Sequence, residues 1–150
     1  MSNYSTEKID ILLVEDNPGD ARLAIEALKD SKINNTWSVV HDGEKALQYL
    51  MKENEFSNVR TPHLILLDLN IPKIDGREVL RIIKEHETLK LIPVVILTTS
   101  KAEEDIIRSY ELHANCYITK PLGLDQFLKV IKTIENFWLT IVRLPFNENE

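Results

Sequence analysis

The chain has 150 residues, a formal net charge of −6 at pH 7, 43% hydrophobic residues and 28% charged residues. These proportions are typical of one globular domain with its own core, and the acidic balance argues against a general binder of nucleic acid or membrane surfaces. The single cysteine, Cys116, excludes an internal disulfide scaffold, and the lack of a signal peptide or a membrane-length apolar stretch predicts a cytoplasmic protein with no membrane contact.

Apolar runs of strand length alternate with segments of helical periodicity along the chain. We predict strands at residues 11–14, 36–40, 64–67, 93–97 and 116–119. We predict helices, from apolar residues at helical spacing, at residues 21–29, 44–52, 77–85, 103–112 and 124 to about 139. Asp20 directly precedes the first helix, a turn at Asp42-Gly43 precedes the second, and residues 54–62 are predicted to form a loop.

Runs of four to five consecutive apolar residues suit a parallel sheet that is covered by helices on both faces. Five strand–helix units fit a flavodoxin-like (βα)5 doubly wound α/β sandwich, with a five-stranded parallel sheet of order 2-1-3-4-5. The carboxyl ends of parallel strands share one edge, where ligands bind. This order places the first and third strands side by side, so Glu15, Asp16 and Asp68 are expected to flank one crevice.

The predicted strands end in residues that can handle a phosphoryl group. Glu15 and Asp16 follow the first strand, Asp68 the third, Thr98 the fourth and Lys120 the fifth. The carboxylate of Asp68 can attack phosphorus and carry the group as an acyl phosphate. A divalent cation held by Glu15 and Asp16, with Mg²⁺ the best candidate, would offset the repulsion between two anions. Thr98 and Lys120 can bind the phosphoryl oxygens.

Each of these residues also has a simpler explanation. Asp16 and Thr98 could be N-caps of the helices that follow them, and a lone Lys-Pro pair such as Lys120-Pro121 carries little information. Capping does not account for all four strand ends in this order, so the complete set favours a phosphoryl-transfer site.

The motifs resemble the receiver domain of two-component response regulators. The residues that carry this resemblance are Ile11 to Asp16, Leu66 to Pro72, Asp75-Gly76, Leu97-Thr98 and Lys120-Pro121. The resemblance covers about residues 9–137 and implies a single receiver domain over 1–150, with a short apolar extension at 138–146. It implies a signalling protein that catalyses only its own phosphorylation and dephosphorylation, with a histidine kinase as the phosphoryl donor.

The resemblance also implies roles for individual residues. Asp68 would be the phosphoacceptor, Asp16 a direct metal ligand, Glu15 a ligand mainly through water, and the backbone carbonyl of Asn70 a further ligand. Lys120 would contact Asp68 at rest and the phosphoryl group afterwards. Thr98 and Tyr117 match the switch residues of receivers. In receivers the hydroxyl, here that of Thr98, moves toward the phosphate, and the aromatic ring, here that of Tyr117, turns inward.

A narrower resemblance connects the chain with the stand-alone regulators of cyanobacterial phytochrome kinases. It is carried by residues 64–70, 75–80, 93–95, 97–100, 109–113 and 135–139. It implies a light-dependent phosphorelay in which the partner kinase is a phytochrome.

Three residues are expected to tune the phosphoryl pocket. Thr99 stands where receivers usually have a smaller residue, and its β-branched side chain is expected to slow phosphorylation by small donors. Asn70 and Ser100 lie two residues beyond Asp68 and Thr98, where receivers tune the attacking water. Neither is a strong acid or base, which predicts a long-lived phosphorylated state.

The last predicted helix is apolar around much of its circumference. Beyond the residues expected to face the sheet, its apolar surface includes Val130, Phe137, Trp138 and Ile141. A second copy of the chain is the expected cover, giving a homodimer through the fourth helix, the fifth strand, the fifth helix and the extension. The alternative is a tail that folds back on its own domain. The four histidines share no metal-ligand spacing and are expected to have surface or packing roles.

Three other classes of function remain as alternatives. An aspartyl phosphatase of the haloacid dehalogenase type would have a second aspartate two residues after its nucleophile, where this chain has Asn70. A flavodoxin-like FMN carrier would have a phosphate-cradling first loop instead of an acidic one. An adaptor that works without phosphorylation would not need Asp16, Asp68 and Lys120, which are all present.

Overall fold

The computed structural model describes residues 8–30, 34–98, 116–119 and 132. Along the chain the strands are β1 (Ile9–Val14), β2 (Asn35–Val40), β3 (Leu64–Asp68), β4 (Val94–Thr98) and β5 (Cys116–Thr119). The helices are α1 (Pro18–Lys29), α2 (Gly43–Met51) and α3 (Gly76–Glu85), with short 3-10 helices η2 (Asn54–Phe56) and η3 (Leu89–Leu91). The predicted helices at 103–112 and 124–139 lie outside the described residues.

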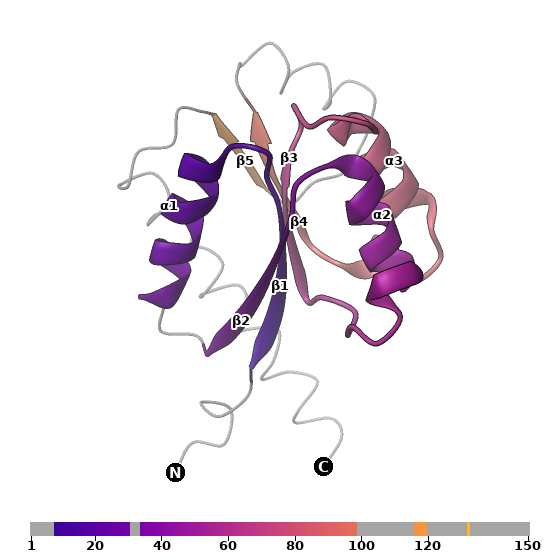
Figure 1. Ribbon diagram of the computed structural model, residues 1–150, viewed down its shortest axis with the longest axis horizontal. Helices are drawn as coiled ribbons and strands as arrows, with labels where there is room; N and C mark the ends of the chain where they lie inside the picture. Colours follow the sequence, from indigo (N-terminus) through magenta and orange to yellow (C-terminus); the bar gives the residue numbers. More distant parts are fainter. Residues whose placement is uncertain (1–7, 31–33, 99–115, 120–131, 133–150) are drawn as a thin grey trace.

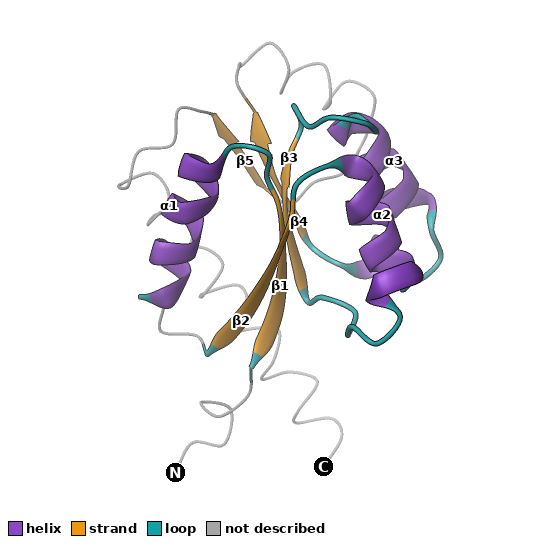
Figure 2. Ribbon diagram, viewed as in Figure 1, coloured by secondary structure: helices purple, strands orange, loops and turns teal. Residues whose placement is uncertain are grey.

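The strands form one parallel sheet of order β2-β1-β3-β4-β5, which confirms the predicted fold. Figure 1 shows α1 on one face of this sheet and α2 with α3 on the other. The same view coloured by secondary structure shows the two helical layers and the sheet between them (Figure 2). The described residues therefore make the helix–sheet–helix sandwich that the alternating pattern predicts.

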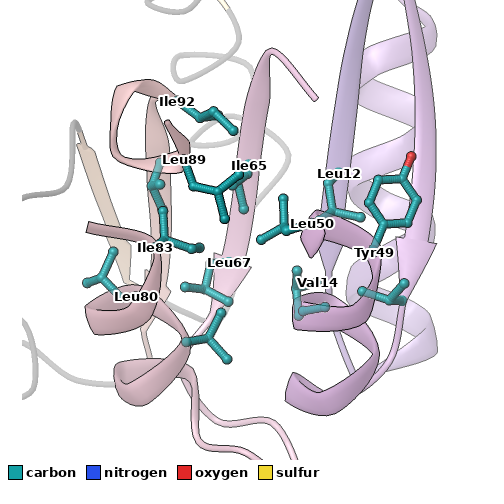
Figure 3. Packing of buried hydrophobic residues seen from close by; sticks show 14 of the residues in the cluster. Leu12, Val14, Tyr49, Leu50, Ile65, Leu67, Leu80, Ile83, Leu89 and Ile92 are labelled. Carbon is teal, nitrogen blue, oxygen red and sulfur yellow. The ribbon is translucent and has the colours of Figure 1, made fainter. Parts of the chain in front are cut away.

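The two faces of the sheet bury separate hydrophobic clusters because successive side chains along a strand point to opposite faces. Leu12 and Leu67 pack with α2 and α3 in one cluster, part of which is shown in Figure 3. Leu13 and Leu66 pack with α1 in the other. These four leucines are fully buried. Burial on both faces explains why the central strands are unbroken apolar runs.

The structure corrects the predicted start of the first helix. Asp20 was expected just before it, but α1 begins at Pro18 and Asn17 is its N-cap, since the Asn17 Oδ1 accepts a hydrogen bond of 2.9 Å from the Asp20 N–H. Proline suits the first helical position, because a backbone N–H at that position would have no partner within the helix and its absence therefore costs nothing. The predicted loop at 54–62 contains η2.

The other two described helices begin where the sequence predicts, within one residue. Asp42 caps α2, with its Oδ1 accepting from the Lys45 N–H at 2.7 Å, and Asp75 caps α3 through the Arg77 N–H at 2.7 Å. Among the described residues, no helix has the length and apolar content needed to cross a membrane.

Candidate functional site

The strand register brings the predicted site residues to one edge of the sheet. Val14 pairs with Leu67, so Glu15 and Asp68 occupy the next register positions of neighbouring strands. Asp68 pairs with Leu97 on β4, and Thr98 pairs with Thr119 on β5. The carboxyl ends of β1, β3, β4 and β5 therefore lie in a row, as the predicted strand order requires.

Asp68 is the last residue of β3 and its side chain is held close to the backbone. The residue is only 3% exposed, and its Oδ1 accepts a hydrogen bond of 3.0 Å from the Asn70 N–H. The Leu69 N–H donates to the Leu97 carbonyl at 3.0 Å, which continues the sheet pairing one residue past the strand end. The carboxylate is thus fixed at the edge of a rigid sheet, which favours a reaction that needs an oriented nucleophile.

The two acids after β1 have different environments. Glu15 is fully buried, and its Oε2 accepts from the Asn17 N–H at 3.1 Å, whereas Asp16 is exposed. Because Asn17 caps α1, the simpler explanation of Asp16 as the N-cap is wrong. Asp16 therefore keeps its carboxylate outside the helix cap, at the same edge of the sheet as Asp68.

The loop between β3 and α3 is packed tightly under Asp68. The Gly76 N–H donates to the Leu69 carbonyl at 3.1 Å, and a Cβ atom at Gly76 would lie 2.6 Å from the Asp68 carbonyl oxygen and 2.5 Å from the Leu69 Cα. No side chain fits there without moving the backbone that carries Asp68. This close approach is a physical reason for glycine in the Asp75-Gly76 motif.

Two contacts near the site were not predicted. The Nδ1 of His41, directly after β2, lies 3.0 Å from the Glu15 carbonyl oxygen, and Gly43 packs against Ile74 in the β3–α3 loop. His41 was expected to have only a surface or packing role, and Gly43 was considered only as part of a turn. Both contacts join segments that are distant in the sequence, so no local pattern indicates them.

The donor atoms fit a hard divalent cation. Glu15 and Asp68 are buried carboxylates at neighbouring register positions, with the exposed Asp16 beside them. In the part of the chain that the structure describes, no three His, Cys, Asp or Glu side chains group closely enough to hold a metal ion. Mg²⁺ does not require such a group, because it is usually held by one or two carboxylates, with waters and phosphate oxygens as further ligands.

Several predicted site residues lie in parts of the chain outside the described ranges. The residues outside the described ranges are Thr99, Ser100, Lys120, Val130, Phe137, Trp138 and Ile141. Thr98 and Tyr117 are described as members of β4 and β5, where Tyr117 pairs with Ile96. The roles assigned to all these residues stay predictions.

A parallel sheet of this order, with acids at the carboxyl ends of its first and third strands, has the architecture of a receiver domain. The chain belongs to the response regulator receiver domain family, whose model matches residues 11–132. It is 51% identical over 145 residues to Response regulator Rcp1 of Synechocystis sp., and this match covers 97% of the chain and 99% of Rcp1.

Solved structures give the same result. The phosphorylated cyanobacterial phytochrome response regulator RcpA is similar with a TM-score of 0.79 and 52% identity, over 90% of this chain and 96% of RcpA. The Mn²⁺-bound form of Rcp1 is similar with a TM-score of 0.77 and 52% identity, over 87% of this chain and 94% of the other. The predicted receiver family and the relationship with phytochrome response regulators are confirmed.

Proposed function

We propose that this response regulator accepts a phosphoryl group on Asp68 from the phosphohistidine of a partner histidine kinase. One carboxylate oxygen of Asp68 forms a bond to phosphorus, while the bond between phosphorus and the imidazole nitrogen breaks and that nitrogen keeps the electron pair. The observation that carries the proposal is the buried carboxylate of Asp68, oriented at the carboxyl end of β3 beside Glu15.

The site is proposed to work with Mg²⁺. Asp16 and Asp68 would bind it directly, the Asn70 carbonyl would be another ligand, and Glu15 would act mainly through water. The bound ion would offset the repulsion between the carboxylate and the phosphoryl oxygens. The fixed Asp68 side chain and the buried Glu15 support this assignment, as does the Mn²⁺-bound form of the similar protein Rcp1.

The partner kinase is proposed to be a phytochrome, because RcpA, at 52% identity, is a cyanobacterial phytochrome response regulator. Lys120 and Thr98 would bind the phosphoryl oxygens, and Thr98 with Tyr117 would convert phosphorylation into a change of packing. The protein would thus be a cytoplasmic signalling switch and not an enzyme with an external substrate.

A homodimer through the fourth helix, β5, the fifth helix and the extension is part of this proposal. Its support is the apolar set Val130, Phe137, Trp138 and Ile141 in the sequence. Sedimentation of the full chain beside a truncation before Phe137 tests it, because only the full chain should form dimers. A tail folded back on its own domain would leave the full chain monomeric.

The phosphoacceptor is tested by incubating the protein with Mg²⁺ and phosphorylated phytochrome kinases. We expect the wild type to gain about 80 Da, the mass of one phosphoryl group, in a form that hydroxylamine removes, and Asp68→Asn to gain nothing. Asp10→Asn is the matched control, since Asp10 lies in β1 at the opposite end of the sheet and should leave labelling unchanged. Labelling of Asp68→Asn, or none of the wild type with any of these kinases, would contradict the proposal. Turnover of small phosphate esters would instead favour the phosphatase class.

A further inference from the structure

The turn between β2 and α2 contacts the loop that follows β1. The Glu15 N–H donates to the Val40 carbonyl at 3.0 Å, and the Glu15 carbonyl oxygen lies 3.0 Å from the Nδ1 of His41. A carbonyl oxygen only accepts hydrogen bonds, so Nδ1 carries the proton and donates it. Both backbone polar groups of Glu15 are therefore held by consecutive residues at the end of β2.

The same turn is anchored on the loop that follows β3. The Gly43 N–H donates to the Pro72 carbonyl at 3.1 Å, and a Cβ atom at Gly43 would lie 1.9 Å from the Ile74 carbonyl oxygen. The start of α2 thus touches the backbone of the loop that contains Asn70. One short turn therefore contacts both the loop that carries Glu15 and Asp16 and the loop that carries Asn70.

We propose that His41 is a positioning residue for the divalent metal site. Its ring ties the Glu15 carbonyl, and with it the acids Glu15 and Asp16, to a turn that is itself fixed on the β3–α3 loop. Mg²⁺ requires nearly ideal octahedral geometry, so the spacing of these two loops affects its affinity. The inference rests on the proposed function, because it concerns the metal site of that function.

Two substitutions separate the hydrogen bond of His41 from its other properties. The amide nitrogen of asparagine lies about where Nδ1 lies in histidine, so His41→Asn keeps a donor for the Glu15 carbonyl. His41→Ala removes the donor. Both variants are uncharged, so a difference between them does not arise from the charge of an imidazolium near the metal.

The test is the dissociation constant of Mg²⁺, measured by isothermal titration calorimetry at one pH on the unphosphorylated full chain. We expect His41→Ala to weaken binding about threefold to tenfold, as the loss of one hydrogen bond would, and His41→Asn to stay within about twofold of the wild type. His63→Ala is the matched control. His63 also bonds the backbone through Nδ1, at 2.9 Å from the Asp10 N, but it lies before β3 at the other end of the sheet. This variant should bind Mg²⁺ like the wild type.

The outcomes distinguish this inference from the proposed function. A wild type that binds Mg²⁺ together with a His41→Ala variant of equal affinity would overturn the positioning role alone. The same conclusion follows if His41→Asn binds as weakly as His41→Ala, or if His63→Ala weakens binding equally. A wild-type chain that does not bind Mg²⁺ would overturn the proposed metal site and the positioning role with it.

Discussion

Substitution of Gly76 by alanine tests how the close packing around Asp68 affects the stability of the fold. Gly76 is the first residue of α3, and alanine is favoured over glycine in helices by up to about 1 kcal/mol. Helix propensity alone therefore predicts that Gly76→Ala stabilises the protein. The structure predicts the opposite sign, because the added Cβ would meet three backbone atoms of Asp68 and Leu69 at 2.5 to 2.8 Å.

The size of the effect follows from these distances. Ordinary contacts of a Cβ atom begin at 3.4 Å, so the nearest backbone atom must move by about 0.9 Å, a shift large enough to break the 3.1 Å hydrogen bond from the Gly76 N–H to the Leu69 carbonyl. Overpacking of this kind costs about 1–3 kcal/mol, and a lost backbone hydrogen bond adds about 1 kcal/mol. After subtracting the helix-propensity gain, we expect a net loss of about 1–3 kcal/mol in the free energy of unfolding.

Equilibrium unfolding in urea measures this loss, and Gly19→Ala is the matched control. Gly19 also lies in the first turn of a helix, but its Cβ would meet only the Asn17 Oδ1, which caps α1, at 3.2 Å, and this flexible side chain needs to give way by only a few tenths of an ångström. Gly19→Ala should not lower the free energy of unfolding by more than about 0.5 kcal/mol, because the helix propensity of alanine offsets a small shift of the cap. A Gly76→Ala variant as stable as the wild type would refute the reasoning. Phosphorylation should also be slower in Gly76→Ala, because the displaced backbone carries Asp68.

Two further outcomes are expected. Thr99→Ala should be labelled faster than the wild type by acetyl phosphate, measured as the rate of phosphoprotein formation, because the β-branched side chain is expected to crowd the pocket; equal rates would contradict this. Burial lowers the pKa of the Lys84 ammonium below its ordinary value of 10.5. Between this lowered pKa and 10.5 the unfolded state binds more protons than the folded state, so the free energy of unfolding of the wild type rises with pH in this window. Urea unfolding at pH 7 and pH 10 should show this gain in the wild type and in the exposed-site control Lys29→Met but not in Lys84→Met. A stability difference between the wild type and Lys84→Met that is the same at both pH values would refute the prediction.

Much of the fold could be predicted from local sequence patterns. Residues 64–67 are apolar without interruption because β3 is buried on both faces, and this pattern by itself indicates a central parallel strand. The right-handed connection of parallel strands then leaves few possible orders, and the observed order was among them. Asp68 could be predicted as a site residue for the same reason, since it directly follows this apolar run.

Helix capping was predicted less well. Asp42 caps α2 and Asp75 caps α3, although neither was predicted as a cap, and Asn17 caps α1 although Asp16, Asn17 and Asp20 all have side chains suited to the role. The choice among them depends on where β1 ends and on the burial of Glu15, which the sequence does not state. Two adjacent acids, Glu15 and Asp16, likewise have opposite exposure although both look suited to a metal.

The sequence by itself determined the strands, their parallel arrangement and the acids at their carboxyl ends, because these depend on the periodicity of neighbouring residues. Only the tertiary structure decided that His41 reaches the Glu15 carbonyl and that Gly43 and Gly76 leave no room for a side chain against the β3–α3 loop. His41 lies 26 positions from Glu15 in the sequence, and Gly43 lies 31 positions from Ile74. Their distances are set by how helices and strands pack together, a property of the folded chain that no short stretch of sequence contains.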